Sequence, residues 1–250
     1  MEHFLNQLIF KTLHTQFHLS EDVPLQEYLT KAGKNRWLDI GCGGNFEPGF
    51  HYLDVFPEGL LSPKIQKQYY RIDILTVSPD HLASLGKFDL VRLQHTFEHF
   101  SWEEAEDVLR KCAMLLNENG LLLISVPDLR VHITKYLSHE YKADKGFAWW
   151  ATQRIPESAP DSCYFSIYAH SLPFEPHKWC YDSEGLVYRI ETTDLFIDIK
   201  ELLLASPLAS VPFTHNRPAE DLCVIARLKL KINDPPGRGR RSAATITSSN

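Results

Sequence analysis

The sequence signal that is most informative about the fold is Trp37-Leu38-Asp39-Ile40-Gly41-Cys42-Gly43-Gly44-Asn45. Its apolar start is typical of a short buried strand, which carries an acid near its end and runs straight into a glycine-rich turn. Glycines allow the backbone to bend tightly, and they allow a ligand to approach where any Cβ would collide. The stretch therefore predicts a strand followed by a ligand-binding turn.

Two kinds of nucleotide ligand compete for this turn. A dinucleotide site needs G-x-G-x-x-G leading into a helix, whose first N–H groups hold the pyrophosphate. In this chain the sixth position is Phe46, and Pro48-Gly49 stand where the helix should run. The turn therefore disfavours a dinucleotide such as NAD and favours a ligand that has an adenosine but no phosphates.

Downstream of this turn, short apolar runs alternate with helical patterns. This alternation is the signature of a parallel α/β sheet. A helix is predicted from Trp102 to Leu116, with Ser101 and Glu104 as a capping box and Asn119-Gly120 as its stop. A second helix is predicted over residues 182–190. The predicted strands are Trp37–Ile40, Phe50–Val55, Tyr69–Ile74, Phe88–Leu93, Gly120–Val126, Leu195–Leu204 and Leu222–Leu230.

Composition and charge exclude several classes of protein. The 250 residues are 44% hydrophobic and carry a formal charge of -6, which disfavours nucleic acid as a partner. The five cysteines are scattered without a C-x-x-C pair, as expected of a reduced, intracellular protein. We find no signal peptide and no apolar run near the roughly 20 residues that cross a bilayer. We therefore expect a cytoplasmic protein without membrane contact.

The pattern predicts three regions. Residues 1–34 form a helical N-terminal cap, residues 35–234 form the main domain, and residues 235–250 form a disordered tail. Within the main domain, residues 129–181 read as an insertion that covers an acceptor, like a lid. Nine of the 36 residues from 146 to 181 are aromatic. These rings either line the acceptor cleft or simply pack the insertion onto the sheet.

The order of motifs resembles the class I S-adenosylmethionine-dependent methyltransferases. The run Asp39-x-Gly41-x-Gly43, then Asp54 and Asp73 after the next two strands, is similar to the cofactor half of that family. The resemblance extends from Arg36 to about Leu137, with fainter similarity in residues 177–199 and 221–228. It implies a Rossmann-like, mostly parallel seven-stranded sheet. The H-x-x-E-H-F turn of residues 95–100 resembles a type 11-like subgroup often found beside sugar- and polysaccharide-modifying enzymes.

The resemblance also implies S-adenosylmethionine as cofactor and assigns residues to it. Asp39 would face the methionine amine, directly or through water, and Gly41 and Gly43 would pass under the methionine and ribose. Asp54 would accept hydrogen bonds from both ribose hydroxyls. The remaining predicted contacts are Asp73 with the adenine amino group, Ile74 beside the ring, and Gln94 at the cofactor's border. The chain departs from the family where Asn45 replaces a third glycine and where only residues 44–50 separate the turn from the second strand.

Methyl transfer from a sulfonium needs positioning and removal of the acceptor's proton. His95 directly follows the fourth strand and is the predicted base, although it could instead shape the cofactor turn through backbone hydrogen bonds. His99 is the second catalytic candidate, with His170 and His177 as rivals. The predicted acceptor is a small molecule, a hydroxyl of a sugar or of another secondary metabolite. The sequence does not predict an oligomeric state.

Other functions remain open. His95, Glu98 and His99 could bind a metal, as in RNA or quinone-precursor O-methyltransferases that use an E-x-x-E-H site. The same H-x-x-E-H string occurs in inverted zinc proteases, but that use requires one helix across residues 93–101, where a strand and a helix cap are predicted. We therefore assign no metal ligand. The chain could also be a non-catalytic scaffold that binds the cofactor.

Overall fold

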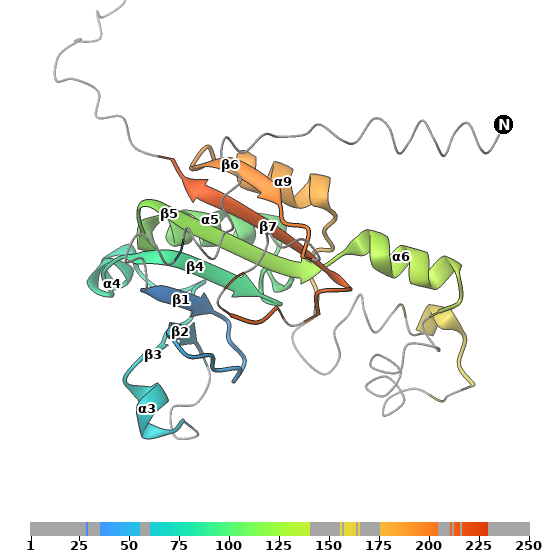
Figure 1. The fold of residues 1–250 in the computed structure, drawn as a ribbon, viewed down its shortest axis with the longest axis horizontal. Helices are drawn as coiled ribbons and strands as arrows, with labels where there is room; N and C mark the ends of the chain where they lie inside the picture. The colour runs from blue at the N-terminus through green and yellow to red at the C-terminus, as the bar shows by residue number, and fades with distance from the viewer. Residues whose placement is uncertain are drawn as a thin grey trace, which may run out of the picture.

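The computed structural model describes residues 29, 36–55, 61–140, 156, 158–163, 165, 176–204, 211, 213–215 and 217–229. These residues form a seven-stranded sheet in the order β3-β2-β1-β4-β5-β7-β6, drawn in Figure 1. Strands β1 to β5 pair in parallel, and β7 runs antiparallel to both of its neighbours. The predicted mostly parallel α/β fold with seven strands is confirmed.

The strands lie close to the predicted ranges. They span Trp37–Ile40 (β1), Phe50–Asp54 (β2), Tyr69–Arg71 (β3), Phe88–Gln94 (β4), Leu116–Pro127 (β5), Phe196–Glu201 (β6) and Asp221–Leu228 (β7). Because β1, β2, β4 and β5 are parallel, their carboxyl ends meet at one edge of the sheet. The first residue of the antiparallel β7, Asp221, pairs with Pro127 and lies at that same edge.

The helices begin at residues suited to that position. They are Pro63–Gln66 (α3), Pro79–Ser84 (α4), Trp102–Leu115 (α5), Leu129–Leu137 (α6) and Ser183–Glu191 (α9), with a 3-10 helix at Phe97–His99 (η2). The predicted capping box of α5 is confirmed, because Ser101 and Glu104 each accept a hydrogen bond from the other's backbone N–H. Helix α6, inside the predicted insertion, had no helical signal strong enough to predict it.

The junction of α5 and β5 differs from the prediction. The helix ends at Leu115 and β5 starts at once with Leu116, so Asn119-Gly120 does not stop the helix. These two residues lie inside the strand, where the register with β4 shifts. Asn119 has φ +58° there, a left-handed conformation that Asn tolerates better than most residues. The Asn-Gly pair therefore marks an irregularity in the strand.

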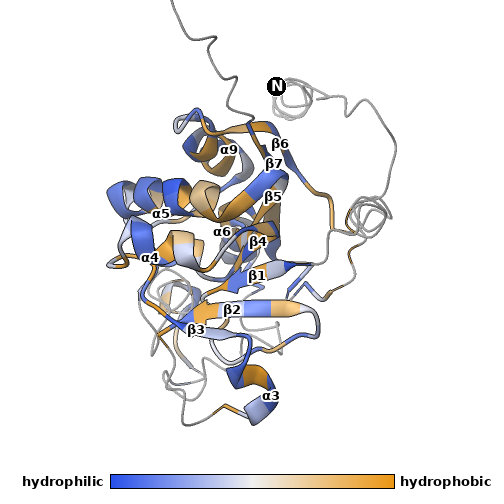
Figure 2. Ribbon diagram, turned by 90° about the vertical axis from the view of Figure 1, so that its left-hand side faces the viewer, coloured by the Kyte–Doolittle hydropathy of each residue, from blue (hydrophilic) through white to orange (hydrophobic). Residues whose placement is uncertain are grey.

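Each face of the sheet has its own hydrophobic core. Helices α4, α5 and α9 cover one face, and α5 shows a hydrophilic outer side in Figure 2. Its inward side chains pack on strand residues such as Leu38, Val91 and Leu122. The opposite face buries Trp37, Phe50, Tyr52, Leu90 and Leu123 together with Leu29 and the nearby Phe213. The two layers hold the carboxyl edge of the sheet in a fixed shape.

Most of the predicted flanking regions lie outside the described residues. This applies to the N-terminal cap over 1–34 except Leu29, to the tail over 235–250, and to much of the insertion over 129–181. Helix α6 is the largest described part of that insertion, and it extends past the end of β5 in Figure 1. Among the described residues, no helix combines the length and apolar character that crossing a membrane requires.

Candidate functional site

The glycine turn after β1 bends as the sequence predicted, and no helix follows it among residues 41–49. Gly41 has φ +73°, and a Cβ there would lie 2.4 Å from the side chain of Thr96. The Thr96 hydroxyl in turn donates to the Gly41 carbonyl at 3.0 Å. A glycine is therefore required at position 41, because Thr96, two residues after the end of β4, packs closely against it.

Gly43 differs from Gly41, because its Cβ position faces open space. Its φ is +55°, and beyond its two chain neighbours no described residue has an atom within 4 Å of the place that a Cβ would take. The Gly43 N–H donates to Oδ2 of Asp54 at 2.8 Å, and Asp54 stands at the end of β2. The turn and the Asp54 carboxylate thus border an open part of the carboxyl edge.

The Asp39 side chain is buried. Both of its carboxylate oxygens accept from Arg92 of β4, at 3.1 Å from Nε and 2.7 Å from Nη2, and the Asp39 residue is 2% exposed. Arg92 also pairs with Glu47, whose other oxygen accepts from the Thr214 N–H at 2.7 Å. Arg92 is thus the partner of Asp39 in this structure, and a contact of Asp39 with the methionine amine, directly or through water, stays a prediction.

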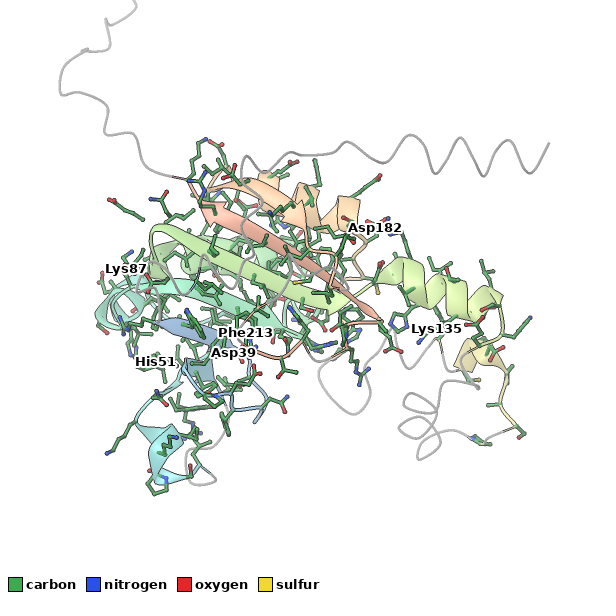
Figure 3. The ribbon with its side chains drawn as sticks, viewed as in Figure 1. Asp39, His51, Lys87, Lys135, Asp182 and Phe213 are labelled. Atoms are coloured by element: carbon green, nitrogen blue, oxygen red, sulfur yellow. The ribbon has the colours of Figure 1, made fainter. Side chains whose placement is uncertain are left out.

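The Arg92 guanidinium also organises aromatic rings on this face. It lies 4.2 Å from the ring centroid of Phe50 and 5.2 Å from that of Phe213. Asp39 and Phe213 accordingly lie close together at the sheet (Figure 3). Through Asp39 and Glu47, the same Arg92 links β1 to the loop that replaces the expected helix after the turn. The pairs of Arg92 with Asp39 and Glu47 therefore help to hold the glycine turn in place.

Residues Asp73 and Ile74 follow β3. The Asp73 carboxylate accepts from the Leu75 N–H at 2.8 Å and from the Thr76 hydroxyl at 3.2 Å, so it closes a local turn. The Ile74 side chain is 6% exposed and belongs to the core under α4 and α5. Its carbonyl accepts from the buried Lys111 ammonium at 2.7 Å. Ile74 thus packs in the core, and its place beside an adenine ring stays a prediction.

The end of β4 brings Gln94 and His95 to the carboxyl edge. Gln94 is buried, and its Oε1 has no hydrogen-bond donor among the described residues. His95 Nε2 lies 2.9 Å from Oδ2 of Asp221, the first residue of β7. Ser125 of β5 approaches the same Asp221 oxygen at 3.4 Å. Three strands therefore converge on the His95 ring.

The conformation and the charge of His95 are unusual. It has φ +53°, and its Nδ1 lies 3.6 Å from Oε1 of Glu98. Burial alone would lower the pKa of His95. The hydrogen bond with Asp221 and the nearby Glu98 outweigh that effect and raise the pKa of His95 to about 9. The ring is therefore charged at neutral pH in this conformation, and only its neutral form can accept a proton.

The second predicted catalytic residue, His99, lies in η2 beside a segment far along the chain. The Glu98 carbonyl accepts from the N–H groups of Lys178 and Trp179 at 2.9 and 3.1 Å. This places the His177 ring 4.9 Å from the ring of His99. Glu98, His99 and His177 thereby come together, whereas the sequence analysis grouped Glu98 and His99 with His95. A helix across residues 93–101, which a protease site requires, is absent because β4 runs to Gln94.

Two charged residues of the site were missed in the sequence. Arg92 carries a signal, since a charge inside the apolar strand Phe88–Gln94 needs a buried partner, and Asp39 stands at the matching register on β1. Asp221 had no such signal. Its role depends on β7 being antiparallel, which brings the start of that strand to the ends of β4 and β5.

The comparison with protein families shows which family the chain belongs to. Residues 1–169 match the family model described as a methyltransferase domain. The chain belongs to this family. The resemblance drawn from the sequence is thereby confirmed, and S-adenosylmethionine is the cofactor that this methyltransferase family binds. No curated protein matches the chain.

Several solved structures are similar to this chain at low sequence identity and with low TM-scores. An O-methyltransferase family protein from Burkholderia thailandensis is 13% identical, with TM-score 0.44, over 78% of this chain and 51% of its own. Magnesium protoporphyrin IX methyltransferase from Synechocystis PCC 6803 is 13% identical, with TM-score 0.44, over 80% and 78%. The N-methyltransferase NodS from Bradyrhizobium japonicum WM9 is 14% identical, with TM-score 0.41, over 80% of each chain. This methyltransferase chain spans about half the length of the Burkholderia protein.

Proposed function

We propose that this methyltransferase transfers a methyl group from S-adenosylmethionine to a hydroxyl of a small molecule, a sugar or another secondary metabolite. The observation that carries the proposal is the carboxyl edge of the sheet. There, Gly43 and Asp54 border open space, and Gln94 and His95 stand at the end of the neighbouring strand β4.

The residues at this edge fit the cofactor. The Asp54 carboxylate is partly exposed and has lone pairs beyond those used by Gly43 and Val55, so it can accept from two ribose hydroxyls. The buried Gln94 Oε1 lacks a donor among the described residues and can accept one from a ligand. Gly41, Gly43 and Asp73 complete the proposed set. Asp39 supports the turn through Arg92. When bound, S-adenosylmethionine supplies an electrophilic methyl group.

His95 is the residue that we propose to receive the acceptor's proton. Asp221 holds the ring by its Nε2 atom and stabilises its charged form, as a carboxylate does behind a catalytic histidine. The charged ring must first release a proton to solvent; the neutral ring, with Nε2–H held by Asp221, can then take the acceptor's proton at Nδ1. His99 follows one turn later and would help to place the acceptor.

A described aromatic surface near this edge supports a sugar-like or aromatic acceptor. Trp179 is 42% exposed and packs on Trp102, with ring centroids 5.2 Å apart. The two rings line a shallow hollow with Ser101, Glu103 and Lys178. Rings of this kind pack against the apolar face of a sugar ring while nearby polar groups bind its hydroxyls. The formal charge of -6 favours such a neutral acceptor over a nucleic acid.

The test is a methyl-transfer assay with labelled S-adenosylmethionine and a panel of sugars, sugar nucleotides and phenolic metabolites. We expect label in at least one hydroxyl acceptor for the wild-type chain. The His95→Asn variant should lose transfer but keep cofactor binding, while His81→Asn in the exposed end of α4 should match wild type. Cofactor binding without transfer to any acceptor would contradict the proposal and favour the non-catalytic scaffold.

A further inference from the structure

Glu98 is a buried acid whose carboxylate has no hydrogen-bond donor in the described part of the chain. It is 2% exposed, and neither of its carboxylate oxygens receives a hydrogen bond from a described residue. The nearest basic atoms, Nδ1 of His95 and Nε2 of His177, lie 3.6 and 3.9 Å from Oε1. An acid removed from water without strong partners costs several kcal/mol. The charged His95 ring approaches the Glu98 carboxylate only to 3.6 Å, so this carboxylate can bind a further positive charge at closer range.

Two imidazoles stand beside this carboxylate. One ligand atom from each of Glu98, His99 and His177 lies within 4.8 Å of the other two. Ligands about 2.1 Å from a tetrahedral ion lie about 3.4 Å from one another, so small side-chain rotations suffice to bring the three onto one ion. The backbone bonds from Lys178 and Trp179 to the Glu98 carbonyl fix the two segments that supply these side chains.

The hydrogen bond of His99 suits metal binding. Its Nδ1 lies 3.3 Å from the Pro176 carbonyl, which can only accept, so Nδ1 carries the proton. In the neutral ring the lone pair is then on Nε2. A metal-bound histidine commonly has its second ring nitrogen oriented in this way by a carbonyl or carboxylate.

We propose that Glu98, His99 and His177 bind a divalent cation of the zinc type. Two imidazoles and one carboxylate form the ligand set of open zinc sites, whereas magnesium and calcium prefer oxygen ligands alone. Three protein ligands leave a coordination position open. The cluster directly follows β4, so that position suits an oxygen of the acceptor, whose hydroxyl proton the ion would make more acidic. This last step rests on the proposed function, whereas metal binding does not.

Metal binding is tested on the full chain without cofactor. After treatment with EDTA and dialysis, the protein is titrated with Co²⁺, whose visible absorption reports nitrogen and oxygen ligands, and then with Zn²⁺ in competition. We expect one Zn²⁺ per chain in wild type. The variants His99→Asn and His177→Asn should bind at least tenfold more weakly. The control His139→Asn alters an exposed histidine with φ +58°, which Asn tolerates, and should bind like wild type.

Thermal unfolding gives a second readout that separates misfolding from loss of the site. Zn²⁺ should raise the Tm of wild type and of His139→Asn, because a ligand of the folded state stabilises it. It should leave the Tm of a folded Glu98→Gln variant unchanged. Wild type that takes up no Zn²⁺, or histidine variants that bind it as tightly as wild type, would overturn the proposal. Zinc binding without methyl transfer would instead reject the proposed function alone.

Discussion

The His95 ring at the end of β4 lies 2.9 Å from the Asp221 carboxylate at the start of β7, although 126 positions separate the two residues. Only the antiparallel pairing of β7 with β5 brings them together. Asp221 is itself buried, so its charge acts on His95 and not on a ligand in solution. The pair has the arrangement of a histidine held and charged by a carboxylate.

This pairing predicts non-additive effects on methyl transfer. His95→Asn should lower kcat by about 10²- to 10⁴-fold, the usual worth of a positioned acid or base, with little change in KM for the cofactor. Asp221→Asn should lower kcat as well, because the ring loses its orientation. The double variant should be slower than His95→Asn by no more than about threefold. Steady-state rates of the four proteins check this, and losses that multiply would show that Asp221 does not act through His95.

The Asp39–Arg92 pair predicts a stability effect. Arg92→Met leaves the Asp39 carboxylate buried and unpaired, and should cost about 3–5 kcal/mol of unfolding free energy. Asp39→Leu combined with Arg92→Met removes both charges and should recover most of that loss. Arg110→Met, which breaks an exposed pair with Glu106, serves as control and should change stability far less than Arg92→Met. Urea unfolding measures all three, and equal losses for the single and double variants would contradict the account.

His51 predicts a dependence of stability on pH. Burial, and then the nearby Arg36 charge, lower the pKa of His51 below its usual 6.5. The folded state therefore favours the neutral form of His51. The stability gained in this way is fully present above about pH 6.5, and it is lost as the pH falls through the lowered pKa of the folded state. His51→Gln should therefore lose less stability than wild type between about pH 7.5 and pH 5 in urea unfolding. A matched His81→Gln should follow wild type, and a His51→Gln curve parallel to wild type would exclude the effect.

The cysteines should differ in reactivity. Burial raises the pKa of Cys42 and of Cys112 to about 12, and it also raises the pKa of Cys223. Since the thiolate is the reactive form, these three should resist iodoacetamide at neutral pH until the protein unfolds. The half-buried Cys163 and Cys180 should be alkylated first. Peptide mass spectrometry resolves the order, and early labelling of Cys112 would show that the core under α5 opens.

The sheet could be predicted because its strands are local apolar runs between turn residues. The α5 capping box was equally visible, since both of its partners lie within four residues. The irregularity at Asn119 was misread as a helix stop, because Asn-Gly signals a left-handed position without saying whether a helix or a strand surrounds it. Helices α3 and α4 each begin with Ser-Pro, a start signal that could have been used.

The site was predicted in part for the same reason. The family resemblance implied Asp54 and Gln94, and the structure places each at the end of a parallel strand, while their contacts with the cofactor stay predictions. The partners of Asp39 and His95 lie 53 and 126 residues away, so they depend on register and strand direction. His177 reaches Glu98 from beyond the insertion, through backbone hydrogen bonds that no spacing in the sequence reveals.

We expect S-adenosylmethionine to bind at the carboxyl edge of the sheet. The most direct test is calorimetric titration of the wild-type chain and of Asp54→Asn with S-adenosylmethionine and its demethylated product. We predict micromolar binding to wild type and an affinity about 10- to 100-fold lower for Asp54→Asn, the worth of one hydrogen bond to a charged group. The exposed control Asp80→Asn should bind like wild type. No binding by folded wild type, or equal binding by Asp54→Asn, would contradict the account.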